Sequence, residues 1–395
     1  MDINQIIALD EQYYMNTFGK RLPVCFANGK GMELVTTEGE IYQDFLGGIA
    51  VTALGHSHPK LTEALHKQVD CLLHTSNYYY VEPQAKLAKL ICEHSCADKV
   101  FFANSGAEAN EGAFKLAKIY FYKQGKNKTE IISLKKSFHG RTLTTVAATG
   151  QEKYQKPYHP LTPGFIQVAP NDFEALLSAV TPNTAAILLE PIQGESGVHP
   201  MDKAYLEQVR KLCDEQDILL IFDEVQTGMG RTGEWFAHQY FDIEPDIFTS
   251  AKALGGGVPI GAVCAKDFVA SAFAPGDHGS TFGGNPLATA AGVAVFEAIE
   301  EEKLLDNAKA MSLYFIEKLT ALKKAHPQIL DIRAAGLLIG VEFSEEHAKN
   351  IYNGLFRANY LTSLCGNTLR LAPPLILTKA DIDGFIEALQ NVLNA

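Results

Sequence analysis

The most apolar strand that this sequence predicts is Asp217-Ile218-Leu219-Leu220-Ile221-Phe222-Asp223. An unbroken apolar run is typical of a strand that is buried on both faces of a sheet. Similar short runs occur at residues 99–103, 130–134, 185–192, 246–250 and 260–265. Helical patterns separate several of them, for example at residues 105–123 and 205–216. This alternation predicts an α/β domain with a mostly parallel, doubly wound sheet over residues 56–287.

The two ends of the chain have a different pattern from the middle. Residues 1–55 hold a short helical pattern and two predicted strands, at 32–35 and 41–45. Two long helical patterns follow Pro286, and short strands alternate with helices from there onward. We therefore expect residues 1–55 and 288–395 to form together a second, smaller α+β domain.

Composition and charge limit the possible partners. The 395 residues are 47% hydrophobic and 20% charged, which is typical of a globular protein. The formal charge of −12 argues against nucleic acid or an anionic membrane as the main partner, although a locally basic pocket can still bind a small anion. No apolar run approaches the roughly 18 residues of a membrane span, and the N-terminus shows neither a secretory nor a transit pattern. These features predict a cytoplasmic protein.

The cysteines and histidines do not form a metal-binding pattern. Seven cysteines are scattered along the chain, and Cys92 and Cys96 are the only close pair. The pair His56 and His58 has no third ligand cluster to accompany it. The sequence therefore predicts reduced thiols and no bound metal.

One lysine lies in unusually apolar surroundings. Lys252 is the only charged residue between Asp246 and Lys266, and the three glycines 255–257 follow it closely. Burial disfavours the ammonium form and leaves a neutral amine that can act as a nucleophile. Glycine lets the backbone approach a bulky ring. The segment therefore suits Schiff-base chemistry with a carbonyl cofactor, whereas a surface lysine before a flexible turn is the simpler interpretation.

Polar residues follow several of the predicted strands. Ser105 and Glu108 have the spacing of a capping box at the start of a helix. Gly106 and Ala107 leave the N–H groups of the first turn open to an anion. Asp223 ends a buried strand, at the edge where open α/β sheets bind ligands. A carboxylate buried there needs a cation such as a protonated ring nitrogen, unless it caps the next turn.

The loop after residues 130–134 carries Phe138 and Arg141. Phe138 is suited to stacking on a planar ring, and Arg141 to holding a carboxylate through two hydrogen bonds. A core phenylalanine beside a surface arginine is the alternative interpretation.

Residues Gly228, Gly230 and Gly233 match the dinucleotide-binding pattern G-x-G-x-x-G. That pattern must open a helix whose N-terminus holds a pyrophosphate. Here two acids precede the glycines, and no long amphipathic helix follows them. A nucleotide-dependent dehydrogenase is therefore only a remote alternative function.

Taken together, these segments resemble the class III (ω-amino acid) aminotransferases, which use pyridoxal 5′-phosphate. The resemblance extends from about Tyr13 to the C-terminus. Its most specific segments are SGAEANE (105–111), FHGRT (138–142), EPIQGESGV (190–198), DEVQTGMGRTG (223–233), SAKALGGGVPIGA (250–262), GSTFGGNPLA (279–288) and LRLAPPL (369–375). It implies the fold type I of pyridoxal-phosphate-dependent transferases and an active homodimer.

The resemblance also implies roles for individual residues. Lys252 binds the cofactor covalently and then moves a proton between the substrate carbon and C4′ of the cofactor, while Asp223 pairs with the protonated ring nitrogen. The other implied cofactor contacts are Ser105, Gly106 and Ala107 at the phosphate, Phe138 and Val225 on the ring faces, Gln226 at the phenolic oxygen, and Thr281 at the phosphate of the neighbouring subunit.

Two arginines are implied to bind the substrates. Arg141, with Ser280 nearby, holds the α-carboxylate. Arg370 takes a second carboxylate, and Glu195 can pair with Arg370 and cover it while a long amine donor is bound. Residues 48–51 lack the tyrosine associated with ornithine aminotransferases, which favours an acylated diamine as the donor.

We therefore expect the δ-amino group of N2-acetylornithine to pass to 2-oxoglutarate, as in arginine biosynthesis. The products would be N-acetylglutamate semialdehyde and glutamate. Succinylornithine, succinyl-diaminopimelate, ornithine and 4-aminobutyrate are alternative donors, because related enzymes use the same catalytic residues for them. A non-catalytic cofactor-binding relative would lack a catalytic residue, whereas Lys252, Asp223 and Arg141 are all present.

Overall fold

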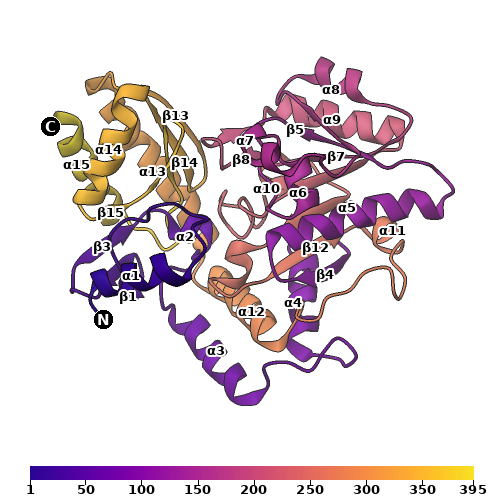
Figure 1. The fold of residues 1–395 in the computed structure, drawn as a ribbon, viewed down its shortest axis with the longest axis horizontal. Coiled ribbons are helices and arrows are strands. Elements are labelled where there is room, and N and C mark those ends of the chain that lie inside the picture. The colour runs from indigo at the N-terminus through magenta and orange to yellow at the C-terminus, as the bar shows by residue number, and fades with distance from the viewer.

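The computed structural model describes all 395 residues, and its largest sheet, which has seven strands, lies on the right of Figure 1. The strands lie in the order β4 (Lys99–Ala103), β12 (Gly261–Ala265), β11 (Ile247–Ser250), β10 (Leu219–Asp223), β7 (Thr184–Leu189), β5 (Glu130–Leu134) and β6 (Phe165–Val168). The strands from β11 to β6 are parallel, whereas β12 is antiparallel to both β11 and β4. The prediction of a mostly parallel α/β sheet is confirmed.

Helices cover both faces of this sheet, because its strands are apolar on both sides. Leu219 and Ile221 of β10 share one core with α5 (Gly106–Lys123), and Leu220 and Phe222 share the other core with α9 (Lys203–Gln216). The remaining short elements here are α6 (Leu143–Ala148), α7 (Glu152–Gln155), η1 (Lys156–Tyr158), α8 (Phe173–Ala179), α10 (Ala237–Phe241), η2 (Lys252–Gly255) and α11 (Asp267–Ala270).

The first and last parts of the chain form a second group of elements, on the left of Figure 1. One sheet contains β1 (Phe26–Lys30), β2 (Glu33–Thr36), β3 (Ile41–Asp44) and β15 (Tyr360–Leu361), and another contains β13 (Ile329–Ala335), β14 (Leu338–Phe343), β17 (Thr368–Leu371) and β16 (Ser363–Cys365). Because β15 pairs in parallel with β3, the two ends of the chain are joined by backbone hydrogen bonds. The domain limits 1–55, 56–287 and 288–395 stay a prediction.

The helices of this second group are α1 (Ile3–Tyr13), α2 (Gly47–Ala50), α13 (Leu304–Ala325), α14 (Glu345–Arg357) and α15 (Lys379–Asn394). Between the groups, α12 (Pro286–Glu301) packs against α3 (Pro59–Cys71), α4 (Glu82–Glu93) and η2. One hydrophobic core contains residues from both groups, so apolar packing holds them together. None of the helices combines the length and the apolar character that crossing a bilayer requires.

The strand that the sequence predicts at residues 185–192 ends earlier, at Leu189. Pro191 has no N–H group to donate, and the chain continues as a small hairpin of β8 (Ile192–Gln193) and β9 (His199–Pro200). The early end places Glu190 in the loop after β7 and Glu195 in the turn between β8 and β9, and both line the same cavity.

Candidate active site

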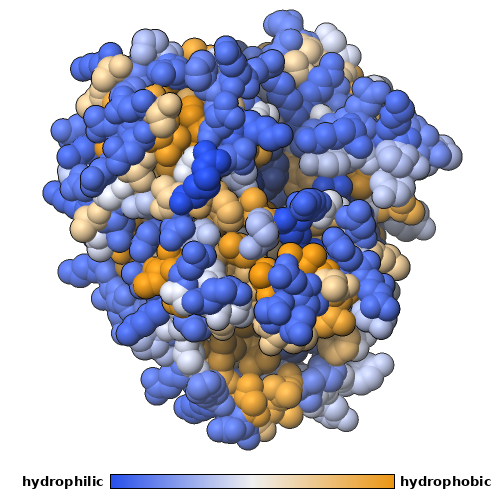
Figure 2. Space-filling view, turned by 60° about the vertical axis from the view of Figure 1, so that its left-hand side comes forward, coloured by the Kyte–Doolittle hydropathy of each residue, from blue (hydrophilic) through white to orange (hydrophobic).

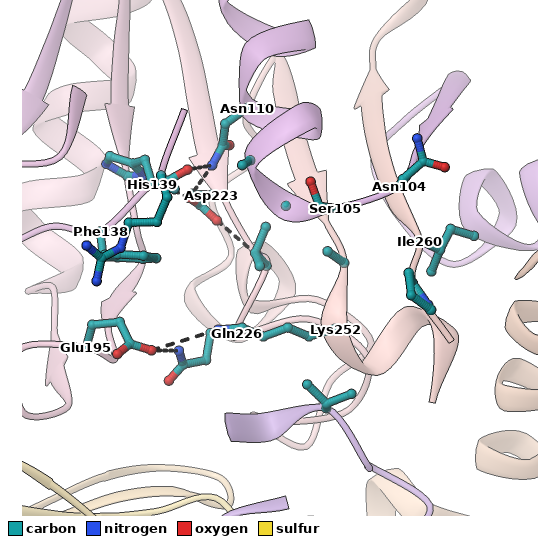
Figure 3. A pocket seen from close by; sticks show the side chains of 18 of the residues that line it. Asn104, Ser105, Asn110, Phe138, His139, Glu195, Asp223, Gln226, Lys252 and Ile260 are labelled. Atoms are coloured by element: carbon teal, nitrogen blue, oxygen red, sulfur yellow. Dashed lines mark hydrogen bonds and ion pairs between the residues drawn. The ribbon is translucent and has the colours of Figure 1, made fainter. Parts of the chain in front are cut away.

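A cavity of about 390 Å³ opens at the carboxyl ends of β5, β7 and β10 (Figure 3). Its walls come from the start of α5, from the loops after these strands and from η2. A cavity of this size suits a small-molecule ligand. The predicted site residues that line it are Ser105, Gly106, Ala107, Phe138, Arg141, Glu195, Asp223, Val225, Gln226 and Lys252.

Lys252 begins η2, shortly after the end of β11, and lines the cavity. Its φ of 48° lies in the left-handed region, which residues other than glycine rarely adopt. Its Nζ lies 4.0 Å from Oε1 of Glu195. Burial lowers the pKa of the Lys252 amine, although the charge of Glu195 opposes this shift. The structure thus supplies the desolvated amine that the sequence predicts.

Asp223 ends β10 and is only 4% exposed. Its Oδ2 accepts a hydrogen bond from Nδ2 of Asn110 and lies 2.8 Å from Nδ1 of His139 (Figure 3). Its Oδ1 accepts a hydrogen bond from the backbone N–H of Val225 at 3.1 Å. Its only ion-pair partner is this histidine, and no lysine or arginine pairs with it. A carboxylate in this position can therefore stabilise a positive charge on a ligand.

Asn110 and His139 hold Asp223 in place, and the sequence analysis gave neither a role. Nδ2 of Asn110 also donates to the backbone oxygen of His139, and its Oδ1 accepts a hydrogen bond from Thr249, both at 2.8 Å. Asn110 is 1% exposed, on the face of α5 that is otherwise built from apolar residues. A buried asparagine on an apolar helix face was the pattern that could have revealed it.

The start of α5 forms a site that is open to an anion. The Ser105 hydroxyl accepts a hydrogen bond from the backbone N–H of Glu108 at 3.2 Å. A Cβ atom on Gly106 would lie 2.8 Å from Cγ1 of Val225, and one on Gly261 would lie 2.2 Å from the backbone oxygen of Ser105. Only glycine therefore allows the helix to begin this close to the cavity wall, where its first N–H groups can face a bound anion.

Arg141 lines the cavity without a carboxylate partner. Its Cζ lies 3.9 Å from the ring centroid of Tyr154 and 5.6 Å from that of Phe138. The side chain is exposed, and it takes part in none of the ion pairs of the chain. A guanidinium held by aromatic rings is free to bind a carboxylate with both of its NH₂ groups.

Arg370, by contrast, is already paired. It is 3% exposed, and its Nη1 donates to Oε1 of Glu195 at 2.7 Å and to Oε1 of Gln226 at 3.2 Å. Nε2 of Gln226 donates to the same Glu195 oxygen at 3.0 Å. Burial alone would raise the pKa of the Glu195 carboxyl, but the charges of Arg370 and Lys252 outweigh it and hold that pKa below its usual value. Glu195 is therefore ionised and covers Arg370.

Glu190 is a second acid of the cavity to which the sequence analysis gave no role. It is 5% exposed, and its Oε1 accepts a hydrogen bond from the backbone N–H of Phe138 at 2.8 Å. Burial, with the nearby charge of Asp223, raises the pKa of the Glu190 carboxyl well above its usual value. We infer that this side chain stays protonated and fixes the backbone of Phe138. An acid directly after an apolar strand was its only sequence pattern.

Replacement of Glu190 by glutamine should leave activity within about threefold of the wild type, because the amide oxygen can still accept the Phe138 N–H. Since the carboxyl pKa is raised in the folded state, its contribution to stability is lost as pH rises above the unfolded value of about 4.3. The difference in unfolding free energy, Glu190→Gln minus wild type, should therefore increase with pH. The increase should be up to about 1.4 kcal/mol for each pH unit. Urea unfolding at several pH values measures this difference, and a difference that falls with pH would show an ionised Glu190.

Ser280 and Thr281 lie outside the cavity of Lys252. They line a second cavity of about 810 Å³. The Ser280 hydroxyl accepts hydrogen bonds from Asn104 at 3.3 Å and from the backbone N–H of Gly283 at 2.9 Å. Because Asn104 lines the first cavity, the two cavities are neighbours. The roles predicted for Ser280 and Thr281 stay predictions.

The G-x-G-x-x-G match does not open a phosphate-binding helix. The chain makes turns from Gly228 to Gly233, and the next helix, α10, begins at Ala237 and has five residues. This local structure gives no support to a nucleotide site.

The geometry around Lys252 and Asp223 agrees with a family match over almost the whole chain. Residues 14–393 match the family described as aminotransferase class-III. The chain therefore belongs to the class III aminotransferases and is a transaminase.

Several relatives within this family are named for a particular amino donor. The acetylornithine aminotransferase of Methanocaldococcus jannaschii is 51% identical over 392 residues, which cover 98% of this chain and 97% of that protein. The crystal structure of acetylornithine aminotransferase from Elizabethkingia anophelis is 34% identical, with a TM-score of 0.89 and coverage of 100% and 99%. A structure of ornithine aminotransferase from Toxoplasma gondii, described as having pyridoxal phosphate at partial occupancy in its active site, is 32% identical, with a TM-score of 0.94 and coverage of 99% and 94%.

Proposed function

We propose that this aminotransferase moves the δ-amino group of N2-acetyl-L-ornithine to 2-oxoglutarate, giving N-acetyl-L-glutamate 5-semialdehyde and L-glutamate. The observation that carries the proposal is that two arginines near Lys252 differ in whether an acidic side chain pairs with them. Arg141 has no acidic partner, whereas Arg370 is covered by Glu195. One free guanidinium suits the donor, which has one carboxylate, and a second that can be uncovered suits the dicarboxylate acceptor.

Pyridoxal 5′-phosphate is the cofactor that fits the cavity. When bound, it supplies an aldehyde that condenses with primary amines and a ring that takes up electrons from the substrate. Two features of the chain support the fit: the buried carboxylate of Asp223 has no lysine or arginine partner, and no side chain blocks the start of α5 at Gly106. The partial occupancy of this cofactor in the T. gondii relative is consistent with it.

We assign the cofactor contacts from these positions. Ser105, Gly106 and Ala107 would bind the phosphate at the helix start. Phe138 and Val225 would contact the ring, and Gln226 would donate a hydrogen bond to the phenolic oxygen. Asp223 would keep the ring nitrogen protonated, because a buried carboxylate favours a positive charge next to it. Thr281 would bind the phosphate in the neighbouring subunit.

We propose two roles for Lys252. Its Nζ would hold the aldehyde of the bound cofactor, a role that suits a desolvated amine of lowered pKa. The same Nζ would also move the proton at the substrate carbon. Arg141 holds the single carboxylate of the donor, with Ser280 nearby, and so directs the δ-amino end toward Lys252.

The identities of the relatives favour acetylornithine over the other donors. Curated acetylornithine aminotransferases are 46–51% identical over nearly the whole chain. Among the solved structures, an acetylornithine aminotransferase is 34% identical and the ornithine aminotransferases are 30–32% identical. The N-acetyl group removes the positive charge of the α-amine, so the donor presents one amine and one carboxylate.

A panel of amine donors tests the proposal. Protein loaded with pyridoxal phosphate is mixed with N2-acetylornithine, N2-succinylornithine, ornithine, succinyl-diaminopimelate or 4-aminobutyrate, and loss of the yellow colour is followed. We expect the highest kcat/KM with acetylornithine and a value at least about tenfold lower with ornithine. A faster reaction with another donor would reassign the donor alone, and the absence of any colour change with all five would contradict the function.

Replacement of Glu195 by alanine should shift the donor preference toward glutamate. Without Glu195, Arg370 is uncovered in both half-reactions and attracts the α-carboxylate of glutamate, while Arg141 holds the distant one. We expect the ratio of kcat/KM for glutamate to that for acetylornithine to rise about tenfold or more. Glu234→Ala, which removes an acid paired with Lys309, is the matched control. An unchanged ratio in Glu195→Ala would exclude a switching role for this acid.

We further propose a cytoplasmic homodimer as the working unit. Thr281 lines a cavity away from Lys252 of its own chain, as expected if it serves a neighbouring subunit. Hydrophobic residues gather at the lower end of Figure 2. Val69, near the end of α3, and Leu72 and Leu73, just after it, are exposed. Exposed apolar patches of this kind mark protein interfaces. Light scattering of the purified protein should give twice the mass of one chain.

A further inference from the structure

Arg231 is a fully buried cation without an acidic partner. It is 1% exposed, it takes part in none of the ion pairs of the chain, and its Nη2 has no hydrogen-bond partner. Burial lowers the pKa of Arg231 to about 10, so the guanidinium is still charged at neutral pH. Burying a charge this way is costly, which indicates that the position has a function beyond packing.

The contacts of Arg231 connect two distant parts of the chain. Its Nη1 donates to the backbone oxygen of Pro373 and, at 3.3 Å, to that of Leu337. Its own backbone oxygen accepts the N–H of Leu337 at 2.9 Å. Leu337 lies in the turn between β13 and β14, and Pro373 lies just after β17. Arg231 therefore binds the C-terminal sheet to the loop that follows β10.

The glycines of the same loop make this approach possible. Gly230 has a φ of 88°, and a Cβ atom on it would lie 2.5 Å from Cδ1 of Leu375. On the other side, a Cβ on Gly336 would lie 2.4 Å from the backbone oxygen of Arg231. In the glycine pattern that resembles a nucleotide fingerprint, Gly230 is thus required by its positive φ and by the close approach of the Leu375 side chain.

Both parts that Arg231 joins lead directly to the substrate site. Pro373 follows β17, which carries Arg370, and the loop after β10 carries Gln226, whose Oε1 accepts a hydrogen bond from Arg370. Arg231 lies within this loop, so it fixes the backbone on both sides of that contact. Arg370 does not itself line the cavity; its guanidinium is bonded to Glu195 and Gln226, which do, so its distance from a bound substrate depends on this spacing.

We propose that Arg231 is a positioning residue that sets the place of Arg370 and thereby the preference for dicarboxylate substrates. The inference rests on the proposed role of Arg370 as the site of the second carboxylate. A displacement of about 1 Å at a binding group can cost up to 100-fold in rate. We therefore expect a selective loss for dicarboxylates, whereas a monocarboxylate that needs only Arg141 should be affected little.

The test compares 2-oxoglutarate with succinic semialdehyde as acceptors in Arg231→Met and Arg231→Lys. Succinic semialdehyde keeps the carboxylate that is distant from the carbonyl carbon, which Arg141 holds, and lacks the second one. We expect kcat/KM for 2-oxoglutarate to fall 10- to 100-fold, mainly through KM, and kcat/KM for succinic semialdehyde to fall less than about threefold. Calorimetry adds a measurement that needs no turnover: affinity for glutarate should fall by a similar factor, and affinity for butyrate should not change.

Two further variants decide between explanations. Arg210→Met removes a half-buried arginine that binds Asp246 in the central sheet, and it should not change the ratio of the two acceptors. Asn307→Ala frees the backbone oxygens of Leu375 and Leu377, in the segment that Pro373 begins, and should cause the same selective loss to a smaller degree. If both Arg231 variants fail to fold, the ratio of kcat/KM for the two acceptors in Asn307→Ala tests whether the position of this segment sets the preference.

Arg370→Met separates this inference from the proposed function. If Arg370→Met loses the dicarboxylate preference and the Arg231 variants keep it, the inference is wrong and the function stands. An equal fall for both acceptors in Arg231→Met would show a purely structural role and also overturn the inference. If Arg370→Met itself keeps the preference, Arg370 does not bind the second carboxylate, and both the assignment and the inference fail.

Discussion

Replacement of Lys252 by alanine should reduce turnover by at least about 10⁴-fold. In the proposed function Lys252 holds the cofactor and moves the proton, so the variant loses both groups, and proton transfer alone contributes up to about 10⁴-fold. No other lysine lines the cavity, so no neighbouring amine can take its place. Single-turnover measurements with N2-acetylornithine give the size of the loss.

Borohydride reduction provides the chemical counterpart of this prediction. In the wild type, the reduced cofactor should be found on the peptide that contains Lys252, and the Lys252→Ala protein should carry no tag. Lys266→Ala, which removes a surface lysine paired with Glu244, should keep both the tag and the activity. A tag on any other lysine of the wild type would overturn the assignment of the nucleophile.

Replacement of Asp223 by asparagine should lower kcat by roughly 10³-fold, as expected when one preorganised electrostatic contact is removed from an active site. The side chain keeps its shape, but its negative charge is lost, and its amide must face the N–H groups of Asn110 and His139. The ring nitrogen would then lose its proton at neutral pH, which a shift of the cofactor absorption band measures. Equal spectra and rates in the variant and the wild type would contradict the assignment.

Asp246→Asn is a matched control for this prediction. Asp246 is also buried and also lies next to the central sheet, where it binds Arg210 and the backbone N–H of Leu220. It is not among the residues that line the cavity. Its replacement should lower the unfolding free energy by about 1–3 kcal/mol and leave the cofactor spectrum unchanged.

The parts of the site that sequence could predict are those where a reactive residue follows an apolar strand. Asp223 after β10 and Lys252 after β11 are examples, because the strand ends themselves define the ligand-binding edge. Glu190, His139 and Asn110 could not be given roles in this way. Their importance depends on contacts between segments that are distant in sequence, and no local pattern reports such contacts.

The fold could be predicted to a similar extent. Long apolar runs predicted the buried strands of the central sheet. An apolar run has the same pattern in either direction, so the antiparallel orientation of β12 could not be predicted. The edge strand β6 was missed because Gln167 interrupts its apolar run, as is usual for a strand at the edge of a sheet that is only partly buried. The early end of β7 was missed because Pro191 was read as part of the apolar run.

The pairing of β3 with β15 has a consequence for how the protein is made. The ribosome delivers β1, β2 and β3 first, and their edge has no partner until nearly the whole polypeptide has emerged. Such a long-range pairing slows folding and leaves an unpaired, aggregation-prone strand edge exposed during synthesis. Slower translation or a lower growth temperature should therefore raise the soluble yield of recombinant protein. We expect this effect to be larger than the effect of substitutions in the active-site cavity on the yield.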